Sequence, residues 1–473
     1  MKLTELKDKK IAILGLGVEG LITAQYFLKH KIPFALCDEK AEDALTSLGK
    51  EWEEMFQSLH KASIVLILGK PFTEEVLQQF DVIIRSPGMR PTANILQKLS
   101  KEGVIITSQT NLFLDNSPAK IIGVTGTKGK GTTATLIYEM LKKSEKDAYL
   151  GGNIGKPPFV FLDILNTQSF VVLELSSYQL QDVEKSPHIA VMLMITSEHL
   201  LPDREGSLQN YHPDVADYVE AKRNIVRFQT ADDIAILNTD YPSTEMTKNI
   251  VRGKLAWVSR YKDVQTGCFI RDNCIILRGE GFEKEVLNVS MIKLPGKHNF
   301  ENVCAATLAA YKTGVSLDDI RFVLKTFKGL EHRLELVREK NGVMYYDDSF
   351  STVPETTIAA IEAFSQPKIL ILGGSTKNSD FTQLGKIIGE TNSIKAIIGI
   401  GVEWQKIKEK IIEKRENLTI IEGLSTMKAI VTAAQKLAGS GDIILLSPSC
   451  ASFGMFKNYK DRGKQFKEQV NLL

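Results

Sequence analysis

Short apolar runs alternate along this chain with longer segments whose apolar residues recur at helical spacing. In the first part of the chain the runs lie at residues 10–14, 32–37, 63–68 and 82–84. Runs of this length that are separated by helix-length segments are typical of buried parallel strands with helical crossovers. The pattern therefore predicts an α/β domain.

The same alternation continues to the end of the chain. A second block has runs at residues 121–124, 170–173, 190–195 and 234–237, followed by a more strand-rich stretch at residues 255–289. A third block has runs at residues 343–346, 369–372, 396–400, 419–421 and 443–446. We therefore expect three α/β domains at residues 1–110, 111–329 and 330–473. The first and third are predicted to be Rossmann-like, and the second to have a mainly parallel sheet.

Polar residues follow these runs directly, at the point where each predicted strand ends. Glu174 and Ser176 follow one run, His199 follows the next, and Asp240 follows a third. In the third block, Asp348 and Ser447 occupy similar positions. Open α/β sheets bind ligands at the carboxyl ends of their strands. The sequence therefore predicts ligand sites at this edge of the sheets.

Composition narrows the class of protein. The chain has 473 residues and a net charge of +2, so charge gives no case for nucleic-acid binding. Its five cysteines form no C-x-x-C pair, and their odd number fits a reducing compartment without a disulfide framework. No apolar run reaches the roughly 20 residues of a membrane span. We expect a cytoplasmic protein with no membrane partner.

A glycine-rich segment at residues 121–133 carries the strongest chemical signal. An apolar run leads into a turn of small residues and lysines, and then into a helix-like segment. Backbone N–H groups of such a turn, together with the helix N-terminus, bind polyphosphates. The residues predicted to bind ATP here are Gly126, Thr127, Lys128, Gly129, Lys130, Gly131 and Thr132.

This segment departs from the strict G-x-x-x-x-G-K-[ST] pattern at two positions. Val124 stands where the pattern has glycine, and Gly131 stands where it has serine or threonine. Thr132 is the nearest hydroxyl that could bind Mg²⁺. Lys130 would neutralise the β- and γ-phosphates.

A second glycine-rich turn, at residues 15–20, follows the first apolar run. It reads G-x-G-x-x-G, and Asp38 lies about twenty residues further on, as in dinucleotide-binding domains. By itself this motif favours NAD or FAD. Asp38 could bind a ribose hydroxyl, or it could accept a hydrogen bond from the N–H of a uracil ring. A nucleotide-binding dehydrogenase is therefore one alternative.

Together with other segments, these two turns resemble those of the Mur ligases of peptidoglycan synthesis, and the resemblance extends over nearly the full length of the chain. The shared segments are residues 15–20, 86–88, 126–130, 152–155, 174–180, 298–302, 329–333, 446–453, 456–459 and 462–463. They occur in the family's order, and the C-terminal ones are typical of its D-glutamate-adding branch. Another Mur-type ligase, or a ligase-fold nucleotide-binding protein with altered amino-acid specificity, is the alternative within this fold.

The resemblance implies a UDP-sugar domain, a central ATPase domain and an amino-acid-binding domain. The implied reaction joins D-glutamate to UDP-N-acetylmuramoyl-L-alanine through an acyl phosphate, with ATP and two Mg²⁺ ions, in a monomer involved in cell wall biogenesis. The Asp-Asn-Pro-Arg motif of the diaminopimelate-adding enzymes is absent.

The resemblance also implies roles for individual residues. Further ATP contacts are Asn299, Asn302, Arg333 and Asp348, and the magnesium ligands are Thr132, Glu174 and His199. Predicted contacts to the UDP substrate are Gly17, Val18, Asp38, Ser86, Gly88, Asn153, Ser176 and Gln179. Predicted contacts to D-glutamate are Thr352, Lys377, Ser447 and Phe456. The implied catalytic residues are Lys130, His199, Arg333 and Lys222, of which Lys222 is carbamylated by CO₂.

One position departs from the family in a way that changes charge. The family often has Asp-Ser-Lys-Ala-Thr-Asn where this chain has residues 348–353, so that Phe350 replaces a lysine. We expect either that another group compensates for the missing cation, or that affinity or substrate choice differs.

Overall fold

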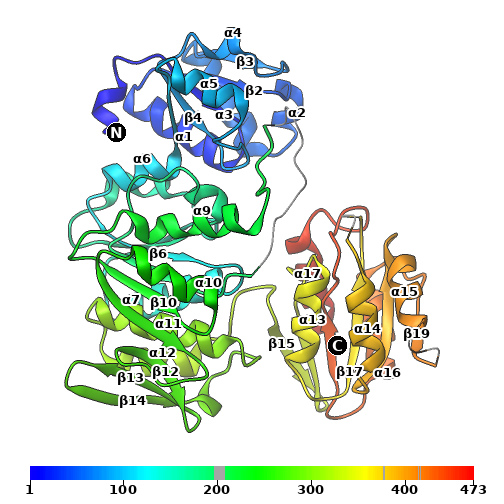
Figure 1. The fold of residues 1–473 in the computed structure, drawn as a ribbon. Coiled ribbons are helices and arrows are strands. Elements are labelled where there is room, and N and C mark those ends of the chain that lie inside the picture. The colour runs from blue at the N-terminus through cyan, green and yellow to red at the C-terminus, as the bar shows by residue number, and fades with distance from the viewer. Residues whose placement is uncertain (197–207, 377–378, 414, 416) are drawn as a thin grey trace. The chain divides into compact units, whose positions relative to one another are not determined.

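The computed structural model describes residues 1–196, 208–376, 379–413, 415 and 417–473 (Figure 1). It divides into two compact units. The first comprises Met1–Val289 with Glu301–Leu324, and the second comprises Ser290–Phe300 with Lys325–Leu473.

The first sheet of the larger unit is parallel, with strand order β3-β2-β1-β4-β5. Its strands are β1 (Ile11–Leu14), β2 (Ala35–Asp38), β3 (Val65–Leu68), β4 (Val82–Arg85) and β5 (Ile105–Ser108). Its main helices are α1 (Val18–His30), α3 (Lys50–Lys61), α5 (Asn94–Lys101) and α6 (Gln109–Asn116). The strand order reverses at β1, which places a ligand crevice beside its carboxyl end.

The second sheet has the order β14-β13-β12-β11-β10-β9-β6-β8-β7. Its parallel part is β6 (Lys120–Thr125), β7 (Ala148–Gly152), β8 (Phe170–Glu174), β9 (Ile189–Met192), β10 (Ile234–Asn238), β11 (Lys254–Ser259) and β12 (Gly267–Arg271). An antiparallel extension adds β13 (Cys274–Gly279) and β14 (Phe282–Asn288). Its helices include α7 (Lys130–Lys143), α8 (Ser177–Leu180), α9 (Val215–Arg227), α10 (Pro242–Glu245), α11 (Asn299–Lys312) and α12 (Leu317–Thr326).

A shared apolar core joins these two sheets into one unit. Phe27 from α1 and Phe113 from α6 belong to the same buried cluster as Phe161 and Leu175 of the second sheet's region. The rings of Phe113 and Phe161 meet edge to face, with centroids 5.8 Å apart. This packing fixes the first glycine loop relative to the second sheet.

The smaller unit holds a third sheet with the order β15-β16-β20-β17-β18-β19. Its strands are β15 (Glu335–Lys340), β16 (Val343–Asp347), β17 (Lys368–Gly373), β18 (Ile394–Ile400), β19 (Thr419–Ile421) and β20 (Ile443–Leu446). Only β15 runs antiparallel to its neighbour among these described strands.

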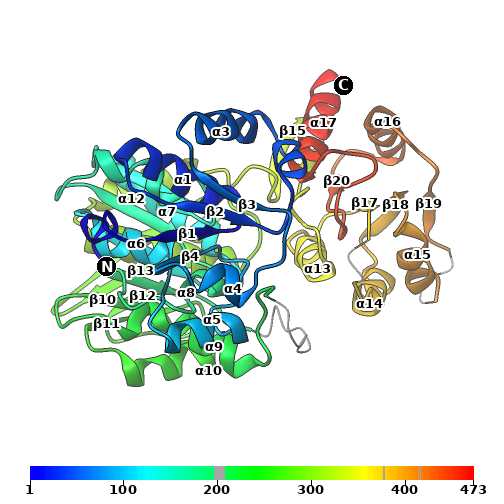
Figure 2. The ribbon, with the colours of Figure 1, turned by 90° about the horizontal axis from the view of Figure 1, so that it is seen from above.

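Helices cover both faces of this third sheet. Figure 2 shows α16 (Met427–Leu437) and α17 (Tyr459–Leu472) on one face, and α13 (Pro354–Glu362), α14 (Thr382–Glu390) and α15 (Trp404–Ile412) on the other. Two apolar clusters, one on each face, bury this sheet. The central strands therefore read as continuous apolar runs in the sequence.

The structure confirms the predicted α/β class, and every predicted strand is present. It adds three strands that were not predicted, β5, β7 and β15. β15 has only exposed and half-buried positions, and it lacks the apolar run that marks the other strands. Each sheet lies within one of the three predicted domain ranges, while the boundaries near residues 110 and 329 stay predictions. Among the described residues, no helix has the length and apolar character that a membrane crossing requires.

Candidate active site

The glycine-rich turn at residues 126–129 connects β6 to α7, which confirms the predicted strand–turn–helix setting. Gly126 and Gly129 have φ angles of +152° and +84°. A Cβ atom on Gly129 would lie 2.1 Å from Asn302 Oδ1, and one on Gly126 would lie 2.8 Å from Leu193 Cβ. Only glycine fits these two positions, so the turn keeps its backbone close to its neighbours.

Hydrogen bonds fix the shape of this turn. Lys130 Nζ donates to the carbonyl oxygen of Thr127 at 2.9 Å. The backbone N–H of Thr127 donates to the carbonyl oxygen of Met194 at 2.7 Å, and the Thr127 hydroxyl donates to the carbonyl oxygen of Thr196. Thr132 is half-buried in the first turn of α7. The turn therefore has the features of a polyphosphate-binding loop at a helix N-terminus.

Lys222 reaches this turn from α9, although it is far away in the sequence. Its side chain is 1% exposed, and its Nζ donates to the carbonyl oxygen of Gly126 at 2.9 Å. Nζ also lies 4.7 Å from the ring centroid of Tyr218. The structure thus brings Lys222 to the phosphate loop. The sequence gives no signal for Tyr218, whose hydroxyl lies 3.1 Å from Thr127 Oγ1.

Glu174 ends β8 in register with Val124 of β6, one strand away from the loop. Its side chain is 3% exposed, and its Oε1 accepts a hydrogen bond from Asn153 Nδ2 at 3.3 Å. A buried carboxylate at a strand end is a donor that suits Mg²⁺, which prefers oxygen ligands. The predicted ligand His199 lies outside the described residues.

Ser176 and Gln179 form the N-terminal capping box of α8. Gln179 Nε2 also donates to Glu19 Oε1 at 2.7 Å, which links the second sheet to the first glycine loop. Burial raises the pKa of Glu19. These two predicted substrate contacts therefore lie where the first and second sheets meet.

The first glycine loop, residues 15–20, also packs closely against the start of α1. A Cβ atom on Gly20 would lie 2.1 Å from the carbonyl oxygen of Gly15, so α1 begins directly against the loop. Asp38 accepts hydrogen bonds from the backbone N–H groups of Leu16 at 2.6 Å and Lys40 at 2.9 Å. Asp38 Oδ2 thus stabilises the loop that would hold a nucleotide, while Oδ1 stabilises the turn that follows β2.

The other predicted UDP contacts surround this loop. Gly17 is the N-cap of α1, and Val18 is 55% exposed. The backbone N–H of Ser86 donates to the carbonyl oxygen of Leu14 at 3.1 Å, and the carbonyl oxygen of Gly88 accepts from Asn210. These four residues lie at the end of β1 and at the end of β4, where the strand order reverses.

Two charged or polar groups of this region were not identified from the sequence. Arg85 is fully buried and forms two hydrogen bonds to Asp182, at 2.5 and 2.7 Å. His212 is also buried, stacks on Tyr178 and contacts Asp217 at 2.6 Å. Burial lowers the pKa of His212, and its two ring nitrogens form hydrogen bonds with Asp217 and Ser177. For Arg85, the sequence offered one signal of a functional position, namely its place at the end of a predicted strand.

Two asparagines predicted to bind adenine lie on α11. Asn302 contacts the phosphate turn, as the close approach of its Oδ1 to Gly129 shows. Asn299, at the start of the helix, donates from Nδ2 to the carbonyl oxygen of Pro295 at 2.7 Å. The neighbouring Glu301 is buried and accepts hydrogen bonds from Asn238 and Tyr241.

In the smaller unit, Asp348 and Ser447 lie together at the carboxyl edge of the third sheet. Ser447 Oγ donates to Asp348 Oδ2 at 2.7 Å, and the backbone N–H of Leu334 donates to Asp348 Oδ1 at 3.1 Å. Burial raises the pKa of Asp348 to about 7.

The remaining residues predicted to bind D-glutamate are spread around this edge. Thr352 lies in the same loop as Asp348, just before α13. Phe456 is 8% exposed and belongs to the apolar core of the third sheet. Lys377 lies outside the described residues.

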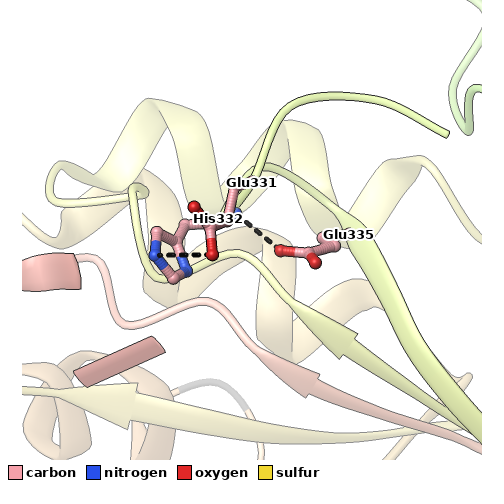
Figure 3. Close-up of side chains that lie close together, drawn as sticks. All are labelled: Glu331, His332 and Glu335. Carbon is pink, nitrogen blue, oxygen red and sulfur yellow. Dashed lines mark hydrogen bonds and ion pairs between the residues drawn. The ribbon is translucent and has the colours of Figure 1, made fainter. Parts of the chain in front are cut away.

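Glu331, His332 and Glu335 gather beside this edge (Figure 3). Three such side chains could suggest a metal site. However, Lys467 Nζ forms ion pairs with both carboxylates, and His332 Nδ1 lies 2.7 Å from Asp347 Oδ2. The cation that these carboxylates hold is therefore a lysine, and the histidine belongs to a buried hydrogen-bonded pair.

A polyphosphate loop on a mainly parallel sheet, with a Rossmann-like sheet before it and another after it in the chain, defines the three-domain fold of ATP-dependent ligases. Family models match in the same order: a MurD-like N-terminal domain at residues 9–108, a Mur ligase middle domain at 124–310 and a glutamate ligase domain at 332–450. The chain belongs to the Mur ligase family.

Individual relatives agree with this membership. The chain is 36% identical over 471 residues to the UDP-N-acetylmuramoylalanine–D-glutamate ligase of Clostridium botulinum (strain 657 / Type Ba4), covering 99% of this chain and 98% of the relative. It is also 36% identical over 474 residues to the protein of the same name from Acetivibrio thermocellus, covering 99% and 97%.

Solved structures show the same fold at low identity. UDP-N-acetylmuramate-alanine ligase MurC from Thermotoga maritima has a TM-score of 0.57 at 16% identity, covering 98% of this chain and 99% of that one. MurF ligase from Thermotoga maritima in complex with ADP has a TM-score of 0.54 at 18% identity, covering 90% and 93%.

Proposed function

We propose that this enzyme joins D-glutamate to UDP-N-acetylmuramoyl-L-alanine with hydrolysis of ATP, in the synthesis of peptidoglycan precursors. The observation that carries the proposal is the 36% identity, over nearly the whole chain, to ligases named for this reaction. The enzyme class is an ATP-dependent amide-forming ligase. We further propose that it acts as a monomer in the cytoplasm.

The chemistry explains why such a site needs cations. A carboxylate is a poor acylating agent, so the γ-phosphoryl group of ATP is first transferred to the carboxylate of the alanyl group. This step releases ADP and gives an acyl phosphate. The amine of D-glutamate then attacks the acyl carbon, the C–O bond to phosphate breaks, and the amine loses a proton. Two anions meet in the first step, so positive charge at the site lowers its barrier.

The phosphate loop would bind ATP. Lys130 neutralises the β- and γ-phosphates, and the backbone of residues 126–132 surrounds them. Thr132, Glu174 and His199 would hold two Mg²⁺ ions, which supply charge stabilisation at the transferred phosphoryl group. Asn299, Asn302 and Asp348 would bind adenine and ribose, and Arg333 would contact the phosphates.

Lys222 would act as a carbamate. Addition of CO₂ to its neutral amine releases a proton and gives a carboxylate-like anion, which suits a position beside the metal ions. The support for this role is its burial against the carbonyl oxygen of Gly126.

The UDP substrate would lie along the first glycine loop and the facing polar groups of the second sheet. The contacts proposed for it are Gly17, Val18, Asp38, Ser86, Gly88, Asn153, Ser176 and Gln179. The contacts proposed for D-glutamate are Thr352, Lys377, Ser447 and Phe456. In this set the charge of Lys377 would pair with a carboxylate.

A substrate panel tests the proposal. Phosphate release with ATP and Mg²⁺ should require both UDP-N-acetylmuramoyl-L-alanine and D-glutamate, and the product mass should equal their sum less one water. Lys130→Ala should abolish release. Equal turnover with L-lysine or diaminopimelate would overturn the amino-acid assignment, and tight binding of NADH without binding of UDP would favour the dehydrogenase.

A further inference from the structure

Two loops of the smaller unit are held together at the carboxyl edge of the third sheet. One comprises residues 330–334, before β15, and the other comprises residues 348–352, after β16. The backbone N–H of Phe350 donates to the carbonyl oxygen of His332 at 3.0 Å. The bond from Leu334 to Asp348 and the His332–Asp347 pair, described above, join the same two loops. Arg333 and Phe350 therefore lie on one fixed scaffold.

The side chains of these two residues are in direct contact. Arg333 Cζ lies 4.0 Å from the centroid of the Phe350 ring, well within the range of a cation–π interaction. Arg333 is half-buried, and Phe350 is 37% exposed. Since Phe350 is not a core residue, the position of its ring is not explained by the packing of the third sheet.

A second aromatic ring holds Phe350 in place. Tyr459, at the start of α17, meets it at a centroid distance of 5.0 Å and an interplanar angle of 89°. Ser349 Oγ donates to the carbonyl oxygen of Tyr459 at 2.8 Å, which ties that helix start to the same loop. Arg333 thus stacks on a ring that is itself oriented by its surroundings.

We propose that Phe350 is a positioning residue that orders the guanidinium of Arg333 for the phosphates of ATP; this inference rests on the proposed function. A guanidinium that stacks through its flat face keeps its N–H donors in the plane, the direction of bidentate phosphate contacts. An arginine that is ordered before ATP binds loses less side-chain entropy on binding. Where the family often has a lysine, this chain therefore lacks that cation, and Phe350 instead orients the cation of Arg333.

The test compares Phe350→Leu, which removes the ring, with Phe350→Tyr, which keeps it. Losing a cation–π contact at such a site corresponds to a decrease of about 2- to 30-fold in kcat/KM for ATP. Phe350→Leu should show this decrease, mainly through KM, with an equal loss of affinity for ADP in a binding titration. Phe350→Tyr should stay within about twofold of the wild type, since it keeps the π face. Phe228→Leu, at a phenylalanine of 38% exposure in the other unit, is the matched control.

A double-mutant cycle separates positioning from a structural role. In an Arg333→Ala background, Phe350→Leu should cause no further loss, because there is no guanidinium left to orient. A loss that persists in that background, or a Phe350→Leu enzyme that matches the wild type, would overturn the inference. If Phe350→Leu unfolds below the assay temperature, Phe350→Met takes its place in the same cycle. A wild-type enzyme without D-glutamate-dependent phosphate release would instead overturn the proposed function.

Discussion

Gln179 Nε2 donates to Glu19 Oε1 at 2.7 Å, and this contact joins the capping box of α8 to the first glycine loop. Glu19 is half-buried and burial raises its pKa, so its carboxylate depends on this donor and on the charge of Arg85 for stabilisation. The contact connects the region proposed for UDP with the strand end that carries Glu174.

Replacing Gln179 with alanine should destabilise this junction. The change removes a hydrogen bond to a carboxylate and leaves a half-buried acceptor without its donor, which costs about 1.5–3 kcal/mol. Denaturant unfolding at pH 7 should show a lower free energy of unfolding, and KM for the UDP substrate should rise. Gln465→Ala, at a glutamine that contacts Asp461 on the surface of α17, is the control and should change neither quantity. An unchanged free energy for Gln179→Ala would contradict this role.

Gly129→Ala should impair binding of ATP. Its φ of +84° disfavours any L side chain, and the added Cβ would collide with Asn302 Oδ1. The Asn302 side chain, the turn or α11 must move, so the affinity for ATP should fall at least tenfold and the free energy of unfolding by about 1–2 kcal/mol. Gly439→Ala is the matched control, because its Cβ would meet only Asp442 Oδ2 at 3.8 Å. Wild-type affinity in Gly129→Ala would mean that this turn does not bind the phosphates.

The sequence predicts this turn well because local chemistry alone determines it. An apolar strand, glycines that need special backbone conformations, and a helix start are all encoded within residues 120–132. The apolar strands of the three sheets are predictable for the same reason. The contacts of Lys222, which only the family resemblance singles out, and of Arg85 do not follow from local sequence, because their partners are about one hundred residues away and come from packing between elements. The buried position of His212 was not predictable either, because its partners Ser177 and Tyr178 come from packing between elements.

Asp348 should make the free energy of unfolding fall as the pH rises. Burial raises its pKa from an ordinary 3.8 to about 7, so the folded chain binds a proton more tightly than the unfolded chain does. The stabilisation is therefore fully present below about pH 4 and is lost as pH rises toward 7. Asp348→Asn should remove this contribution, so its free energy of unfolding relative to wild type should increase with pH between 4 and 7. A difference that stays constant over this range would contradict the raised pKa.

Lys222→Ala should abolish turnover, and added acetate or formate should restore part of it. The substitution removes the proposed carbamate, and a small carboxylate could occupy the space beside the carbonyl oxygen of Gly126. Rates measured against carboxylate concentration should saturate. Lys130→Ala is the control, since it lacks a cation rather than an anion and should not be rescued. A folded Lys222→Ala enzyme that no carboxylate rescues would argue against the carbamate.

The buried pair of Arg85 and Asp182 gives the largest expected effect on stability. Arg85 is fully buried, and Asp182→Ala would remove the carboxylate that is hydrogen-bonded to it, which costs about 3–5 kcal/mol. Since the pair joins β4 of the first sheet to the chain after α8, the loss should also raise KM for the UDP substrate more than KM for ATP. The control is Glu54→Ala, which breaks an exposed pair with Lys50 and should cost no more than about 0.5 kcal/mol. Denaturant unfolding measures the loss in free energy of unfolding for both variants. A loss for Asp182→Ala as small as that for Glu54→Ala would show that Arg85 finds another partner.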